Sequence, residues 1–163
     1  MHATLAIRLR GYPALDTQYF ITTDKNRLEI PMIHAYLSGS SYWAAGRAIE
    51  AVRKSIDNSL CFSVLTSDGR QVGFARVVTD YSTFAWLCDV FVLEQHRGRG
   101  LGKRLVEAIA SYSELSTVRR MLLATRDAHE LYRRYAGFSV LEHPERWMER
   151  LPTDPTASGT DVA

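Results

Sequence analysis

The feature that most constrains this chain is a glycine- and arginine-rich stretch, residues 97–104, which separates two kinds of apolar pattern. Before it, residues 84–93 are largely aromatic and aliphatic, which is typical of a strand. After it, apolar residues recur at helical spacing, at Leu101, Leu105, Ile109 and Tyr112. We therefore expect an α/β protein in which this stretch forms a strand-to-helix turn.

The composition of this turn predicts an anion-binding site. Glycines lack a Cβ atom, so backbone N–H groups can come close to a bound group. The free N–H groups in the first turn of a helix then favour an anion. Four cations add positive charge to the same spot: Arg97, Arg99, Lys103 and Arg104. The sequence thus predicts a phosphate-bearing ligand at the turn.

Two common phosphate-binding motifs do not fit the turn. A Walker loop needs Gly, four residues and then Gly-Lys-Ser/Thr, but Arg97 stands at its first position and Arg104 at its hydroxyl position. A dinucleotide fingerprint that starts at Gly98 would need its third glycine where Lys103 stands. Neither class of nucleotide site is therefore expected.

The turn instead resembles the coenzyme A loop of the GNAT superfamily of acyl-CoA-dependent N-acetyltransferases. The loop signature is Arg or Gln, two residues, Gly, one residue, then Gly or Ala, and residues 97–102 match it in full. Residues 128–138 match a second family pattern, Ala-x-x-Leu-Tyr…Gly-Phe, which is expected on the last helix. Two motifs in the family's order make the resemblance specific. It covers roughly residues 20–150.

The resemblance implies an α/β fold with a mixed central sheet and the order β-α-α-β-β-β-α-β-α-β. The residue patterns agree with this order, and they predict a closing pair of strands at 138–141 and 147–149. The resemblance also implies that acetyl-CoA is the acyl donor. The cofactor-binding residues that it implies lie at the strand end and in the turn: Val90, Phe91, Val92, Arg97, Gly98, Arg99, Gly100, Leu101, Gly102 and Lys103.

The reaction implied is direct attack by an amine on the thioester carbonyl, and it benefits from an acid for the leaving thiolate. Tyr132 stands at the family's general-acid position. A phenol with a pKa of about 10 is a plausible donor to the thiolate of a thiol with a pKa of about 8.5. Tyr135, one turn away, is the alternative. Thr125 replaces an asparagine that contacts the cofactor in many members, and its hydroxyl can still form a hydrogen bond.

Asp89 is the candidate general base, because an acid on a buried strand is costly unless it is paired or functional. Strict alternation puts Asp89 on the face opposite Cys88 and Val90, so a bulge is needed to re-aim it. Glu29, His34 and a chain of water molecules remain open as alternatives.

Three aromatic residues near the link between the first two expected helices, Tyr36, Tyr42 and Trp43, lie in a region that often forms the acceptor site in this family. Such rings can stack on an aromatic or cationic acceptor, although core packing explains them equally well. We expect Arg47 and Arg53 to be solvated. The acceptor remains open between a small amine, an amino acid, an antibiotic and a protein N-terminus, and the resemblance leaves a homodimer open.

The 163 residues predict one domain, with a loosely structured segment at 1–18, an acetyltransferase domain at 19–151 and a disordered tail at 152–163. A hydrophobic content of 46% with no long apolar run predicts neither a membrane span nor a signal peptide, so we expect a cytoplasmic protein. Cys61 and Cys88 are expected as free, buried thiols, and no metal site is expected.

Two other functions use the same sequence features. A non-catalytic acyl-CoA sensor would bind the cofactor without turnover. A nucleic-acid binder would use the cations of residues 97–104, but the net charge of +2 and the glycines disfavour it.

Overall fold

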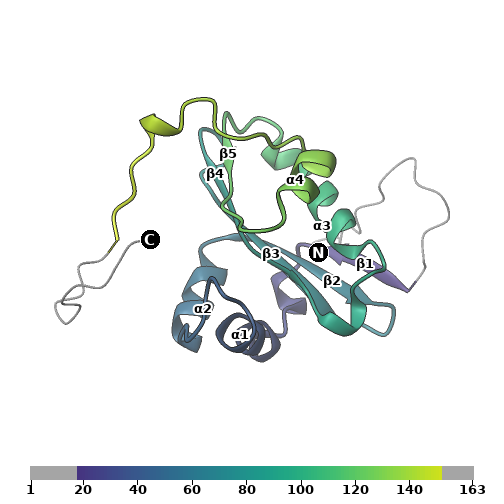
Figure 1. Cartoon of the computed structure of the whole chain (residues 1–163). Helices are drawn as coiled ribbons and strands as arrows, with labels where there is room; N and C mark the ends of the chain where they lie inside the picture. The colour runs from purple at the N-terminus through teal and green to yellow at the C-terminus, as the bar shows by residue number, and fades with distance from the viewer. Residues whose placement is uncertain (1–17, 152–163) are drawn as a thin grey trace, which may run out of the picture.

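The computed structural model describes residues 18–151, which form a five-stranded sheet with helices on both faces (Figure 1). The strands lie in chain order across the sheet, and only the pair β4 and β5 is parallel. Their bounds are β1 Tyr19–Thr22, β2 Leu60–Thr66, β3 Gln71–Thr79, β4 Ala85–Val92 and β5 Met121–Leu122. The mixed sheet confirms the predicted fold class.

Four α-helices cover the two faces of the sheet: α1 Ile30–Gly39, α2 Ile49–Asp57, α3 Leu101–Ala110 and α4 His129–Ala136. α1 and α2 lie on one side, and α3 and α4 lie on the other (Figure 1). Short 3-10 turns occur at Lys25–Arg27, Glu94–His96, Ser113–Leu115 and Pro144–Arg146. No helix within residues 18–151 is long and apolar enough to cross a membrane.

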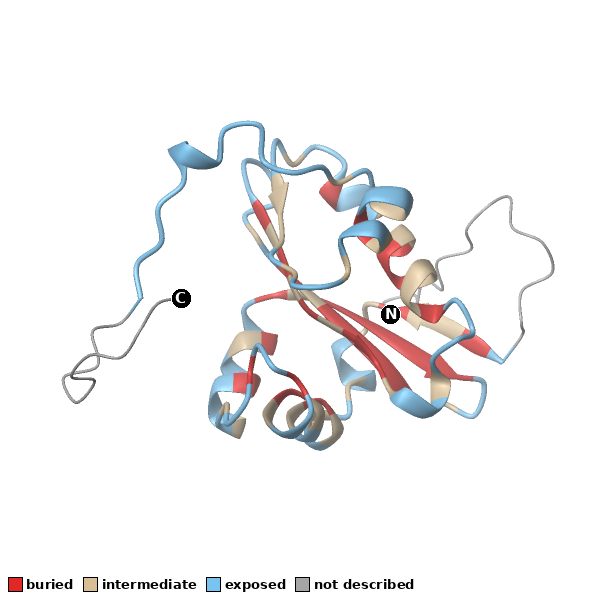
Figure 2. Cartoon of the chain, in the orientation of Figure 1, coloured by how far each residue is buried: buried red, intermediate tan, exposed pale blue. Residues whose placement is uncertain are grey.

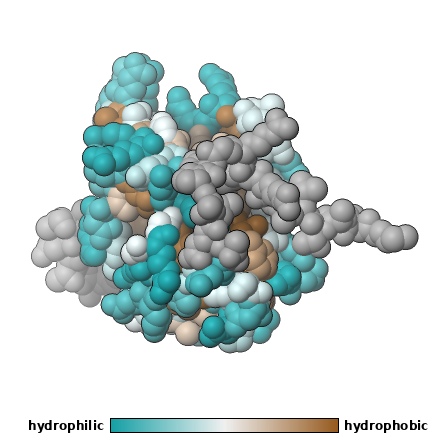
Figure 3. All heavy atoms as spheres, turned by 90° about the vertical axis from the view of Figure 1, so that its right-hand side faces the viewer, coloured by the Kyte–Doolittle hydropathy of each residue, from teal (hydrophilic) through white to brown (hydrophobic). Residues whose placement is uncertain are grey.

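Each face of the sheet has its own hydrophobic core, as the buried inner surfaces in Figure 2 show. Leu105 and Ile109 of α3 pack on one face, and Ile33 and Val52 of α1 and α2 pack on the other. Because both faces are covered, the inner strand β2 is a nearly continuous buried run rather than an alternating one. The outer side of the molecule viewed in Figure 3 is mostly hydrophilic, with apolar residues in small patches.

The end of the chain departs from the prediction. Residues 138–141 and 147–149 form no strands, and the sheet ends at the two-residue strand β5. The predicted closing pair is therefore wrong for this chain on its own. The sequence pattern reports apolar and β-branched content, but a strand also needs a partner edge. The loose segment and the tail predicted at the two ends fall outside the described residues, apart from Gln18.

Candidate active site

The edge of β4 that faces β5 is open over most of its length. Only Ala85 and Trp86 of β4 pair with β5, at Met121 and Leu122. Beyond that point the two strands part. The backbone N–H of Leu93 donates to the carbonyl of Val72, so alternation turns the backbone of Phe91 toward β3 and those of Val90 and Val92 toward the opening. A linear amide-containing ligand can pair with such an edge.

A β-bulge interrupts β4 at Asp89, the feature that the sequence analysis needed to re-aim this side chain. Phe74 of β3 faces Phe91 and Arg76 faces Cys88, so the one residue between them on β3 faces both Asp89 and Val90. Asp89 has a φ of 52°, in the left-handed region. The extra residue resets the alternation and sends the Asp89 side chain to the α1–α2 face of the sheet.

On that face, the Asp89 carboxylate is buried between two arginines and an indole. Its Oδ2 accepts from Arg47 Nη1 at 2.8 Å and from Arg76 Nε at 2.6 Å, and its Oδ1 accepts from Trp43 Nε1 at 3.1 Å. The Asp89 side chain is 1% exposed, whereas that of Arg47 is 25% exposed. The expectation that Arg47 is solvated is therefore wrong, because its guanidinium neutralises a buried anion. The same pairing favours a positioning role for Asp89 over that of a base.

The three predicted acceptor-site aromatics come together beside this cluster. The ring of Tyr36 stacks on that of Phe91, with centroids 3.8 Å apart, and lies 6.5 Å from that of Trp43. Tyr42 meets Trp43 edge-on at 5.0 Å. Tyr36 packs against the core, whereas Tyr42 and Trp43 are exposed. Core packing thus explains Tyr36, and the other two rings remain available to a ligand.

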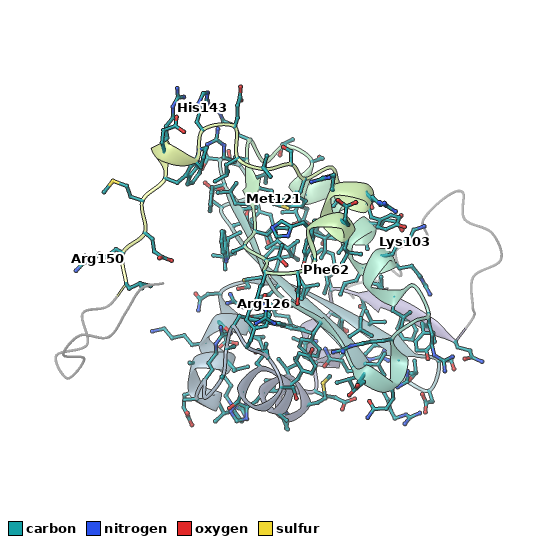
Figure 4. The ribbon with its side chains drawn as sticks, in the orientation of Figure 1. Phe62, Lys103, Met121, Arg126, His143 and Arg150 are labelled. Atoms are coloured by element: carbon teal, nitrogen blue, oxygen red, sulfur yellow. The ribbon has the colours of Figure 1, made fainter. Side chains whose placement is uncertain are left out.

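Arg126, in the loop between β5 and α4, joins this aromatic group from across the opening. Its guanidinium lies 3.8 Å from the centre of the Tyr42 ring, and its backbone N–H donates to the Tyr42 hydroxyl. Figure 4 shows Arg126 where the α4 side of the molecule meets the α1–α2 side. The contact connects the two loops that flank the open strand edge.

The glycine turn is built to leave its backbone accessible. Gly98 and Gly100 have φ values of 74° and 72°, which other residues rarely adopt. A Cβ atom placed at Gly98, Gly100 or Gly102 would meet nothing within 4 Å, so the space beside them is open. The first intrahelical bond of α3 runs from Arg104 N to Gly100 O, so the N–H groups of Leu101 and Gly102 make no bond within the helix. These features fit a pyrophosphate.

The cations of the turn are only partly directed at this space. Arg97 donates to the carbonyl of Val92 and to the Tyr36 hydroxyl, so it braces the end of β4. Arg104 donates to the carbonyl of Tyr19 in β1. Lys103 lies over the ring of Tyr135 in α4, and Figure 4 shows Lys103 on the α4 side of the molecule. Arg99 is exposed beside the glycines. Backbone N–H groups therefore carry more of the predicted anion site than the arginines do.

Tyr132 is buried at the edge of a groove of about 1000 Å³ between β5, α3 and α4. Burial is the main cause that raises the pKa of its phenol to about 12, with smaller effects from Tyr42 and Asp127. The phenol is thus protonated at any physiological pH. Thr125 lines the same groove, and its hydroxyl accepts from the backbone N–H of Ala128 at the start of α4.

The other candidate bases hold the fold together. The carboxylate of Glu29 accepts from the backbone N–H of Gln71, and the Gln71 side chain accepts from the backbone N–H of Glu29. His34 Nε2 lies 3.1 Å from the carbonyl oxygen of Arg47. His34 thus supports the loop that carries Arg47, rather than facing open space.

Sequence reasoning missed Arg76 and Arg126. For Arg76 a signal existed, because it is the only charged residue within the otherwise apolar strand 72–78, and β4 carries a single acid. Oppositely charged residues that stand alone on neighbouring strands are candidates for a buried pair. For Arg126 no signal existed, because its contact with Tyr42 joins two loops that lie 84 positions apart.

Residues 30–138 match the Acetyltransferase (GNAT) family, which is more than half of the chain. The chain belongs to this family. A GNAT protein of known crystal structure from Xanthomonas campestris pv. campestris is 46% identical, with a TM-score of 0.79 over 87% of this chain and 96% of that one. The Gibberella zeae protein named "Putative acetyltransferase FG08082" is 29% identical over 73% of this chain and 78% of its own length.

More distant GNAT-fold structures show the same architecture. A Deinococcus radiodurans R1 structure has a TM-score of 0.63 at 19% identity, over 83% of this chain and 89% of that one, and supports the fold alone. GNAT members generally use acetyl-CoA as donor, and the open β4 edge and the glycine turn of this chain fit it. Within residues 18–151, no three His, Cys, Asp or Glu side chains gather in a way that could hold a metal ion.

Proposed function

We propose that this GNAT protein transfers an acetyl group from acetyl-CoA to a primary amine by direct attack. The observation that carries the proposal is the bulged, half-paired strand β4, which ends beside the glycine turn. The strand and the turn thus offer an open edge for an amide-containing arm and the N–H groups of a helix start for a pyrophosphate. A plain structural turn would need neither feature.

The donor is held by the backbone more than by side chains. The N–H groups of Leu101 and Gly102 and the open glycines bind the pyrophosphate. Along β4, the backbone groups of Val90 and the N–H of Val92 pair with the pantetheine arm. The carbonyl of Val92 already accepts from Arg97, so it supports the strand end instead. Phe91 does not offer its backbone to the pantetheine arm. Its ring stacks on that of Tyr36.

The charge beside the bulge helps the acceptor to lose its proton. Two guanidinium groups face one carboxylate at Asp89, so the cluster keeps a net positive charge. A positive charge nearby disfavours an ammonium ion and so lowers the pKa of a bound amine. The free amine that the attack requires is then reached at a lower pH, without a dedicated base.

Tyr132 serves as a hydrogen-bond donor to the leaving sulfur. With a pKa of about 12, against about 8.5 for a thiol, complete proton transfer would cost about 5 kcal/mol. A hydrogen bond that strengthens as charge develops on sulfur avoids most of this cost. The thiolate then takes its proton from water after it has left.

The test is single-turnover acetylation of a panel of amines by the native enzyme, Tyr132→Phe and the control Tyr135→Phe. We expect Tyr132→Phe to slow acyl transfer by about 10²-fold at a pH where the amine is free, because only the donor is removed. The control should stay close to the native rate. Equal rates for all three proteins would refute the role of Tyr132. Tight binding of acetyl-CoA without turnover on any amine would instead establish the alternative function, an acyl-CoA sensor.

A further inference from the structure

Two loops on either side of the open β4 edge form a continuous surface of aromatic rings and guanidinium groups. Arg126 lies 3.8 Å from the centre of the Tyr42 ring, and Tyr42 meets Trp43 edge-on at 5.0 Å. Trp43 Nε1 donates to Asp89, which also accepts from Arg47. Figure 4 shows Arg126 where the two sides of the molecule meet. We call Tyr42, Trp43, Arg47 and Arg126 the loop cluster.

The loop cluster is open to solvent and lies close to the proposed hydrogen-bond donor of the reaction. Tyr42 and Trp43 are both exposed, and so is the side chain of Arg126. Tyr42 is one of the causes that raise the pKa of the Tyr132 phenol, an effect that requires the two side chains to lie near each other. An acceptor that approaches the end of the open β4 edge therefore meets the loop cluster.

The rings of the loop cluster already hold a cation that belongs to the protein. An exposed aromatic ring can bind a cationic ligand through its face. Here the Arg126 guanidinium lies over the Tyr42 ring, and the Arg126 backbone N–H donates to the Tyr42 hydroxyl, so two contacts fix it there. A cationic acceptor would have to displace this guanidinium. The arrangement therefore disfavours small amines that carry several positive charges.

The charge of the loop cluster favours an anionic ligand instead. Arg47 and Arg76 pair with Asp89. Arg126 lies 3.7 Å from Asp127, and both of these side chains are exposed. No other carboxylate within residues 18–151 pairs with these three arginines, so one positive charge is left over. The charge that lowers the pKa of a bound amine thus also repels the protonated amine as it arrives.

Both exposed arginines keep N–H groups that the described fold does not use. Arg47 donates to Asp89 through Nη1, and its Nε and Nη2 make no hydrogen bond within residues 18–151. Over the same residues, the Arg126 side chain makes no hydrogen bond, because 3.7 Å to Asp127 is too long for one. A guanidinium presents its N–H groups in a planar fork that fits a carboxylate or a phosphate. The loop cluster can therefore bind such a group.

We propose that the acceptor is a small primary amine that carries its own anionic group, a carboxylate or a phosphate, bound by the unused N–H groups of Arg126 and Arg47. The inference rests on the proposed acetyl transfer and names its substrate class. The anion offsets the positive charge that would otherwise repel the protonated amine. It takes no part in the bond changes: the amine nitrogen bonds to the acyl carbon and loses a proton to water, and the carbon–sulfur bond breaks to release the thiolate.

The test is isothermal titration of acceptors into the full chain, with and without coenzyme A, so that it needs no turnover. The acceptors are ω-amino acids of increasing length, each with its own neutral carboxamide, together with aminoalkylphosphonates and a tripeptide with an amidated C-terminus. We expect at least one amino acid or phosphonate to bind about 10-fold more tightly than the amide of the same length, because a hydrogen bond to a charged group is worth about that factor. Added salt should reduce this ratio, since exposed charges are screened.

Three variants locate the preference. Arg126→Gln should remove most of it, whereas the matched control Arg134→Gln on α4, at 69% exposed against 67%, should keep it. Asp127→Asn should strengthen binding of the acid, because it removes the carboxylate beside Arg126.

Four results would overturn the proposal: no binding of any acid, equal binding of acids and amides, tighter binding of the tripeptide, or a preference that Arg126→Gln leaves unchanged. Preferred binding of an acid that is never acetylated has a different meaning. It would support the anion site and refute the acetyl transfer.

Discussion

Neutralising Asp89 should destabilise the whole protein and not only its chemistry. Asp89→Asn is the informative change, because asparagine tolerates the φ of 52° at the bulge and keeps the size of the side chain. What it removes is the negative charge between Arg47 and Arg76. Two guanidinium groups are then left next to each other without a counter-ion.

The size of the effect follows from the burial of the three groups. Removing one partner of a fully buried ion pair costs about 3–5 kcal/mol. Arg47 and Arg76 have side chains 25% and 13% exposed, so part of their charge is hydrated and the lower end applies. We expect a loss of about 3 kcal/mol in the free energy of unfolding. For a domain of this size, that lowers the melting temperature by about 6–12 °C.

The assay is urea unfolding followed by circular dichroism, with Asp68→Asn as the matched control. Asp68 pairs with Arg70 in the exposed β2–β3 turn, where both side chains are more than half exposed, so its loss should cost far less stability than the loss of Asp89. If Asp89→Asn costs no more than the control, the buried charge cluster does not stabilise the fold. If it costs little stability but abolishes the rate at low pH, Asp89 is the base after all.

Three further changes have definite outcomes. Gly100→Ala should cost about 1–2 kcal/mol in stability because of the φ of 72°, and should weaken acetyl-CoA binding in a titration. Gly102→Ala is the contrast, because Gly102 lies in the helix with open space at its Cβ position, so alanine there should raise stability by up to about 1 kcal/mol. Raising the pH from 10 to 12 should destabilise the native protein by about 2 kcal/mol more than Tyr132→Phe, because the folded phenol keeps its proton to a pKa of about 12 while the unfolded one loses it near 10. An equal loss of stability in urea unfolding of the two proteins would contradict this. The thiols of Cys61 and Cys88 should react with iodoacetamide at pH 8 far more slowly than free cysteine, since the pKa of each is raised to about 11. If mass spectrometry finds either one modified at the rate of a free thiol, that result would contradict their burial.

The sequence predicted those parts of the site that depend on local geometry. The glycines at 98 and 100 stand at left-handed positions, as a close-approach turn requires. The need for a bulge at Asp89 followed from strand alternation alone, and the register of β3 and β4 contains it. Both features arise within a few residues of chain, where spacing and conformation determine each other.

The sequence could not predict the contacts that join distant segments. The pairing of Asp89 with Arg47 spans 42 positions. The local sequence around an arginine in a loop looks the same whether its side chain is solvated or paired with a distant acid. The segment after α4 was misread for a related reason. Residues 138–141 and 147–149 have the composition of strands, but a strand also needs a neighbouring edge to pair with, and within residues 18–151 these residues pair with none.

The most direct test of diphosphate binding at the glycine turn compares two donors by isothermal titration. Acetyl-CoA carries the diphosphate, and S-acetyl pantetheine has the same thioester and arm without it. Two charge-assisted hydrogen bonds from the turn are worth about 3 kcal/mol together, so acetyl-CoA should bind at least about 10²-fold more tightly. Equal affinity for the two compounds, or no binding of acetyl-CoA, would show that the turn beside residues 97–104 does not hold a diphosphate.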